Sequence, residues 1–208
     1  MSGERRHAIV LAAGRGIRLG RGPKGALPWN GEVLATRAAR SATEAGCTVT
    51  VGVRPEDAVS QNWLRARCPT ARIVRVHDAD LGLSASLRAA VLPVTLSPVD
   101  AVIVMLVDQP GVDAAVIRRL FDARRAGRIA RATWNGVPGN PVVFGVDHLL
   151  SAAAFSRGDA GARDWIRTNT HLVDDIECGM LARGDDIDVP QDLRTWLDAA
   201  RSAPGPPL

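Results

Sequence analysis

Apolar runs of strand length alternate with longer stretches of helical periodicity along most of the chain. Runs such as HAIVLAA, CTVTVGV and DAVIVMLVD contain few charged residues, which is typical of strands that are buried on both faces. The alternation predicts an α/β protein with a mostly parallel sheet between two layers of crossover helices. The predicted strands are residues 7–13, 47–53, 71–77 and 100–108, and the predicted helices are residues 32–45, 56–67, 83–92 and 113–126.

The pattern changes after residue 128. Two short predicted strands, RIARATW and NPVVF, flank the turn-rich segment NGVPG, which predicts a small β-hairpin lobe over residues 128–165. No repeat and no linker interrupts the chain, so we expect one domain over residues 1–200 and a disordered tail at 201–208. The remaining predicted elements are helices at 147–154, 160–169 and 190–200 and a strand at 171–176.

The composition is that of a globular protein. The 208 residues are 46% hydrophobic and 23% charged. No apolar run approaches the ~20 residues that a membrane-spanning helix needs, and residues 1–8 lack the apolar core of a signal peptide. We therefore expect a cytoplasmic protein that does not associate with membranes.

The polar residues indicate no nucleic-acid partner and no zinc site. The net charge is +4, but basic residues are scattered among acidic ones, and the chain has no Tyr and only three Phe to stack on bases. The three cysteines form no C-x-x-C pair, and the four histidines show no ligand spacing. We expect these cysteines and histidines, and the five tryptophans, to have structural roles.

The most informative segment is LAAGRGIRLGRGPKGALPW, which follows the first predicted strand. Its glycines are spaced one residue too far apart for a dinucleotide loop, and Pro23 and Pro28 fall where the helix of such a loop would run. Its lysine is not followed by the hydroxyl residue of a Walker loop. An open, non-helical loop remains, and its backbone N–H groups and the cations Arg15, Arg18, Arg21 and Lys24 could wrap around a triphosphate. A charged surface loop is the structural alternative.

This loop resembles the signature of nucleotidyltransferases related to the molybdenum cofactor guanylyl- and cytidylyltransferases (MobA/MocA type), L-A-A-G-x-S-x-R-M-G-x-x-K followed by Leu-Pro. Gly16 stands where the serine is usual, Leu19 replaces methionine, and one extra residue precedes Lys24. Further segments resemble the family in the same order, and the resemblance spans residues 7–197. These segments are LGLSASLRAA, MLVDQP, GNPVVF, RGDAGARDWI and DIDVPQDL.

The resemblance implies a single-domain, three-layer α/β/α, Rossmann-like nucleotidyltransferase fold and Mg²⁺-dependent transfer. Lys24 and Arg18 would hold the β- and γ-phosphates and act in catalysis together with Asp108. Ser84 and Ser86 stand at a predicted helix start, where ordinary capping is an equal alternative. The expected nucleotide-binding residues are Leu11, Ala12, Ala13, Gly14, Arg15, Gly16, Lys24, Ser84, Ser86 and Asp108.

Three aspartates are candidate ligands for Mg²⁺. Asp108 follows a buried strand, and open α/β sheets bind ligands at the carboxyl ends of their strands. Asp186 and Asp188 alternate in DDIDVP, so we expect them on one face of a strand. The resemblance favours Asp188 as the second ligand and leaves Asp186 in reserve. A helix cap or a solvated strand end is the structural alternative for all three.

The acceptor would bind to residues that match the family's later segments. These are Gly139, Asn140, Pro141, Asp159 and Arg163, with Asn140 in place of the usual histidine. The D-Q-P form at Asp108 resembles the cytidylyl branch, which implies transfer of CMP from CTP to molybdopterin cofactor, with a molybdenum hydroxylase as recipient. The alternatives are the same chemistry with GTP or another phosphorylated acceptor, and a carrier that binds the cofactor without turnover.

Overall fold

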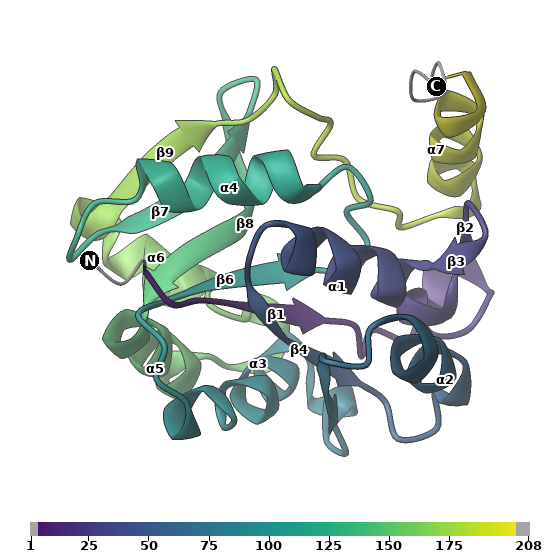
Figure 1. The fold of residues 1–208 in the computed structure, drawn as a ribbon, viewed down its shortest axis with the longest axis horizontal. Coiled ribbons are helices and arrows are strands. Elements are labelled where there is room, and N and C mark those ends of the chain that lie inside the picture. The colour runs from purple at the N-terminus through teal and green to yellow at the C-terminus, as the bar shows by residue number, and fades with distance from the viewer. Residues whose placement is uncertain (1–3, 203–208) are drawn as a thin grey trace.

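The computed structural model describes residues 4–202, which form a central seven-stranded sheet between two layers of helices (Figure 1). The strands of this sheet are β1 (Arg6–Leu11), β4 (Thr48–Val53), β5 (Arg72–Arg75), β6 (Ala101–Leu106), β7 (Ile129–Trp134), β8 (Val137–Gly145) and β9 (Val173–Glu177). Their order is β5-β4-β1-β6-β8-β7-β9. The first four strands of this order are parallel, β8 is antiparallel to both of its neighbours, and β9 is parallel to β7.

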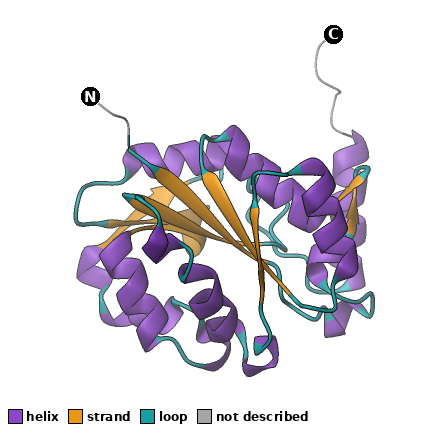
Figure 2. Ribbon diagram, turned by 60° about the horizontal axis from the view of Figure 1, so that its bottom comes forward, coloured by secondary structure: helices purple, strands orange, loops and turns teal. Residues whose placement is uncertain are grey.

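The helices cover both faces of the sheet (Figure 2). They are α1 (Leu34–Glu44), α2 (Ala58–Arg67), α3 (Leu83–Val91), α4 (Ala114–Ala123), α5 (Val146–Phe155), α6 (Arg163–Thr168) and α7 (Pro190–Ser202). Buried residues of α1, α2, α4 and α7 share one apolar cluster, and those of α3, α5 and α6 share the other. Along β1, Ala8 and Val10 belong to the first cluster and Ile9 and Leu11 to the second, because successive side chains point to opposite faces.

The predicted mostly parallel α/β sheet is confirmed. The hairpin predicted after residue 128 is present as β7 and β8, and both strands are part of the central sheet rather than a lobe beside it. Its turn is Asn135-Gly136, with φ angles of 52° and 80° that suit a tight two-residue hairpin. β8 therefore begins at Val137, and Gly139, Asn140 and Pro141 lie within the strand.

Two local predictions are wrong. The loop after β1 is not free of helix, because it contains single 3₁₀ turns at Ile17–Leu19 and Lys24–Ala26 and leads into the short strands β2 (Pro28–Trp29) and β3 (Glu32–Val33). Residues 186–188 do not form a strand. There the backbone crosses the end of the sheet, and the side chain of Ile187 is buried.

Within residues 4–202, no helix has both the length and the apolar composition needed to cross a bilayer. Residues 201–202 belong to α7, and the rest of the predicted tail lies outside the described residues. Cys47, Cys68 and Cys178 are buried and unpaired, as predicted from their spacing.

Candidate functional site

The candidate site lies at the carboxyl ends of β1 and β6, neighbouring strands in the middle of the sheet. Residues 12–27, which we call the glycine-rich loop, leave β1 here, with Ala12 N–H donating to the carbonyl of Gly52 at 2.8 Å. β6 ends at Leu106, two residues before Asp108. Because open α/β sheets bind ligands at the carboxyl ends of their strands, this position favours Asp108 as a functional residue.

A third segment reaches the same place. Residues 178–189, which we call the C-terminal strap, connect β9 to α7 without regular structure. Ile187 N–H donates to the backbone carbonyl of Asp108 at 2.8 Å. The carboxylate of Asp192 accepts the N–H groups of Asp188 and Val189, each at 2.9 Å, which caps α7. The strap is therefore fixed on both sides of Asp188.

The glycine-rich loop folds back on itself. Lys24 N–H donates to the carbonyl of Gly14 at 3.0 Å. Gly16 has a φ angle of +62°, and a Cβ atom there would lie 2.3 Å from the carbonyl oxygen of Gly22. The family that this loop resembles usually has serine at the position of Gly16. A serine there would clash in this loop, which has one extra residue before Lys24.

We expect Gly16→Ser to destabilise the protein and to weaken binding of nucleoside triphosphates. The matched control is Gly20→Ser, because Gly20 also has a positive φ angle, +64°, but no atom lies within 4 Å of the Cβ that it would gain. Gly20→Ser should cost about 1–2 kcal/mol of unfolding free energy from its backbone conformation alone. Gly16→Ser should cost clearly more, as measured by urea unfolding, and equal losses in the two variants would contradict the steric explanation.

The structure brings four predicted residues together. The ammonium group of Lys24 lies 2.5 Å from Oδ2 of Asp108 and 2.5 Å from Oδ1 of Asp188. Arg18 contacts the other oxygen of Asp188 at 2.9 Å, from a largely exposed position. Burial acts to lower the pKa of Lys24, but the charges and hydrogen bonds of the two carboxylates outweigh it and raise that pKa. Lys24 is therefore a fixed cation between two fixed carboxylates.

These carboxylates fit a hard divalent cation. Oδ1 of Asp108 is buried and has no hydrogen-bond partner in the structure. Mg²⁺ needs only one or two protein carboxylates when phosphate oxygens complete its shell. Among the residues whose side chains the structure describes, no group of three or more His, Cys, Asp or Glu is arranged to share a metal. Asp108 and Asp188, together with oxygens of a bound phosphate, can provide the ligands that Mg²⁺ requires.

Asp186 has a different environment from Asp188. Asp186 lines a large cavity, and partial burial and the neighbouring charge of Asp108 raise its pKa to about 6. In contrast, the hydrogen bond from Lys24 lowers the pKa of Asp188. Asp188 is thus the more fully ionised of the two at neutral pH.

This cavity has a volume of about 990 Å³ and lies between the ends of β6 and β8, the strap and helices α3 and α6. Its wall is mainly apolar, with Leu11, Leu106 and Phe144 among the lining residues. Of the five predicted acceptor residues, Gly139, Asn140 and Arg163 line it, and Pro141 is buried within β8. Four arginines line the same cavity: Arg131, Arg163, Arg167 and Arg183.

A second pocket, of about 380 Å³, lies beside the glycine-rich loop and shares only Leu83 with the large cavity. Asp159, predicted to bind the acceptor, lines this second pocket instead. Ser84 is buried, its hydroxyl has no partner, and it lines neither space. The predicted nucleotide-binding residues that line the second pocket are Ala13, Gly14, Arg15 and Ser86.

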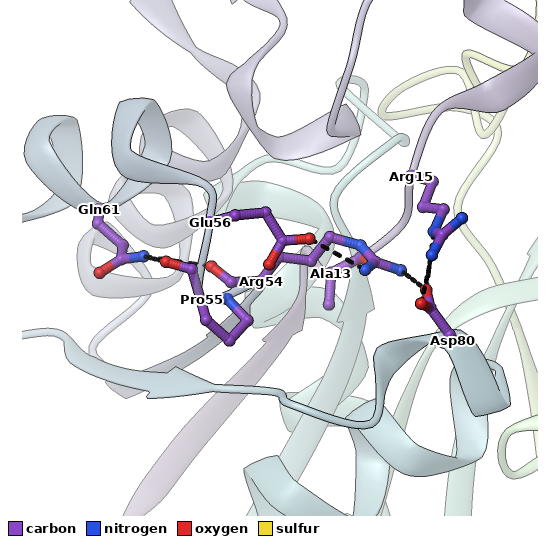
Figure 3. A network of polar contacts seen from close by, with 7 residues as sticks. All are labelled: Ala13, Arg15, Arg54, Pro55, Glu56, Gln61 and Asp80. Atoms are coloured by element: carbon purple, nitrogen blue, oxygen red, sulfur yellow. Dashed lines mark hydrogen bonds and ion pairs between the residues drawn. The ribbon is translucent and has the colours of Figure 1, made fainter.

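Several residues around these two spaces were not predicted from the sequence. Arg54 follows β4 and donates to the backbone carbonyl of Ala13 at 2.9 Å and to Asp80 at 2.5 Å (Figure 3). Arg54 could have been predicted from the sequence because it directly follows an apolar strand, whereas nothing in the sequence marks Asp80. Gln109 and Trp134 line the large cavity. Gln109 also holds the strap, through a 3.1 Å hydrogen bond to the carbonyl of Gly184.

Known proteins resemble this chain in sequence and in fold. Residues 8–174 match the MobA-like NTP transferase domain. Nicotine blue oxidoreductase of Paenarthrobacter nicotinovorans is 34% identical over 196 residues, which cover 91% of this chain and 95% of that protein. A nucleotidyl transferase of Methanothermobacter thermautotrophicus has a similar structure, with a TM-score of 0.81, 22% identity, and coverage of 97% of this chain and 100% of that one.

Another similar structure is that of Rv0371c of Mycobacterium tuberculosis H37Rv in complex with manganese. Its TM-score is 0.73 at 25% identity, covering 94% of this chain and 99% of that chain. The family match takes in the parallel strands β4, β5 and β6, most of β1, and the segments that carry Lys24 and Asp108. By its sequence and by its fold, the chain belongs to the family of the MobA-like NTP transferase domain, a family of nucleotidyltransferases.

Proposed function

We propose that the protein transfers CMP from CTP to a phosphate group of molybdopterin cofactor. In this reaction an oxygen of the acceptor phosphate forms a bond to the α-phosphorus of CTP. The bond from the α-phosphorus to the oxygen that bridges to the β-phosphate breaks, and pyrophosphate leaves with that oxygen. An ionised phosphate needs no strong general base, so the protein must chiefly position the two substrates and neutralise charge.

The observation that carries this proposal is the arrangement of Lys24, Asp108 and Asp188 between the glycine-rich loop and the large cavity. Lys24 and Arg18 are the cations nearest to the two aspartates, and they would bind the β- and γ-phosphates and the leaving pyrophosphate. A divalent cation held by Asp108 and Asp188, with Asp186 in reserve, would neutralise charge on the α-phosphate.

The large cavity supports an acceptor that has both an apolar and an anionic part. Its apolar wall suits a ring system, and Arg163 can bind a phosphate through paired N–H groups. The other three arginines of the cavity are each paired with an aspartate. Gly139, Asn140 and Arg163 would contact the acceptor there. The product would then pass to a molybdenum hydroxylase as recipient.

The test is to incubate the protein with Mg²⁺, molybdopterin cofactor and each of the four nucleoside triphosphates in turn. We expect pyrophosphate release with CTP and a CMP group on the cofactor, detected by mass spectrometry. Release with GTP instead would retain the chemistry and change the donor. Cofactor binding without any pyrophosphate release would favour a carrier protein.

A second candidate function comes from the 34% identity to nicotine blue oxidoreductase. A redox enzyme has no need for the Lys24, Asp108 and Asp188 arrangement, so this arrangement favours nucleotidyl transfer. The same assay decides between the two if a further arm contains NADH or NADPH and a quinoid dye. Dye-dependent oxidation of the nicotinamide, without pyrophosphate release in the other arms, would establish the redox function instead.

A further inference from the structure

The pocket beside the glycine-rich loop has the place and size for the base of a bound nucleotide. One side of it is formed by Ala13, Gly14 and Arg15 at the start of the loop. It is distinct from the large cavity that the acceptor would occupy, with which it shares only Leu83. If the triphosphate follows the loop toward Lys24, the base lies at the loop's beginning, against this pocket.

In this pocket, two arginines donate hydrogen bonds to the carboxylate of Asp80. Arg54 donates to its Oδ1 at 2.5 Å, and Arg15 donates to both of its oxygens (Figure 3). The hydrogen bonds from Arg54 and then from Arg15 lower the pKa of Asp80. An ionised carboxylate accepts hydrogen bonds and donates none.

The two arginines differ in how firmly they are held. Arg54 has a side chain only 8% exposed and is also bonded to the carbonyl of Ala13 and to Glu56. Arg15 is 54% exposed, and Asp80 is the one side-chain partner that the described part of the chain gives it. Arg15 can therefore swing away and leave Asp80 oriented by Arg54, with an oxygen free to accept another N–H group.

We infer that Asp80 selects the base of the nucleoside triphosphate by accepting a hydrogen bond from an exocyclic amino group. An amino group presents N–H donors to the carboxylate in the position now taken by the guanidinium of Arg15. Arg15, once released, becomes available to the phosphates. This inference rests on the proposed function, because it requires that a nucleoside triphosphate binds at the loop.

A hydrogen bond to Asp80 distinguishes two pyrimidines of nearly the same shape. Cytosine has an amino group at the position where uracil has a carbonyl oxygen. The first can donate to Asp80, whereas the second would set an acceptor against a carboxylate. One hydrogen bond to a charged group corresponds to about a 10- to 100-fold difference in affinity, so CTP should bind that much more tightly than UTP.

The experiment measures dissociation constants of CTP and UTP by titration calorimetry, with Mg²⁺ and without acceptor, in the wild type and in two variants. Asp80→Asn retains the shape of the side chain but adds an amide donor, so we expect the CTP-to-UTP preference to fall to about threefold or less. Asp78→Asn makes the same substitution at an exposed aspartate that does not line the pocket, and it should leave the preference unchanged. Thermal unfolding confirms that both variants are folded.

Each outcome supports or overturns a distinct statement. An unchanged preference in Asp80→Asn, or equal affinities for CTP and UTP in the wild type, overturns the role of Asp80 and leaves the proposed function standing. If the protein binds GTP rather than CTP, the matched pair is GTP and ITP, which lacks the 2-amino group. A GTP preference that Asp80→Asn removes supports Asp80 and overturns CTP as the donor. Failure to bind any nucleoside triphosphate overturns both proposals.

Discussion

Asp108→Asn is expected to lower pyrophosphate release by about a thousandfold, which corresponds to ~4 kcal/mol of activation free energy. The substitution preserves the size of the side chain and removes its negative charge. In the protein itself it breaks one ion pair, to Lys24, and Oδ1 has no hydrogen-bond partner to lose. The fold should therefore survive, and a steady-state pyrophosphate assay beside a thermal unfolding curve separates the two effects.

The matched control for this variant is Asp113→Asn. Asp113 lies in the same connection from β6 to α4, where its carboxylate caps the helix by accepting the N–H groups of Ala115 and Val116. Asparagine caps helices about as well as aspartate, so this variant should be folded and active. Turnover within twofold of the wild type in Asp108→Asn would remove Asp108 from the proposed metal site.

Lys24→Met should weaken the use of the nucleotide and strengthen the binding of a divalent metal ion. Without its ammonium group the loop loses a cation for the triphosphate, and we expect kcat/KM for the nucleotide to fall by about 100-fold or more. Asp108 and Asp188 at the same time lose the cation that they share at 2.5 Å. Mn²⁺ should then bind about tenfold more tightly in the absence of nucleotide, because two carboxylates no longer have a competing positive charge.

Electron paramagnetic resonance of free Mn²⁺ measures the second effect without turnover. Arg21→Met is the control, since Arg21 is an exposed cation of the same loop that contacts neither aspartate. It changes the net charge equally and should alter Mn²⁺ binding little. A Mn²⁺ affinity that is the same in Lys24→Met and in Arg21→Met would show that Lys24 does not compete for the metal position.

The layered fold could be predicted because its signal is local. β6 is apolar at every position and β1 is apolar from Ala8 onward, which marks strands buried on both faces wherever they lie in the chain. The short strands β2 and β3 carry no such signal. Trp29 of β2 instead packs edge to face on Trp196 of α7, at 5.9 Å between ring centroids, a contact with a residue near the other end of the chain.

The same limit explains the error at Asp186 and Asp188. The alternation Asp-Ile-Asp fits a strand with one buried face, and it fits equally a strap in which Ile187 alone is buried. No neighbouring strand pairs with these residues, and Ile187 N–H bonds instead to the backbone of Asp108. A pattern within the strap cannot reveal whether a partner strand is present.

The α/β layers, the glycine-rich loop and the acidic residue that follows β6 could be predicted from the sequence, because each depends on neighbouring residues in the chain. Which of these polar groups meet depends on the tertiary structure. Lys24 reaches Asp108 and Asp188, and Arg54 reaches Asp80, from segments far apart in sequence. Their contacts depend on the order of the strands and on the path of the strap, which are set by packing against the rest of the molecule.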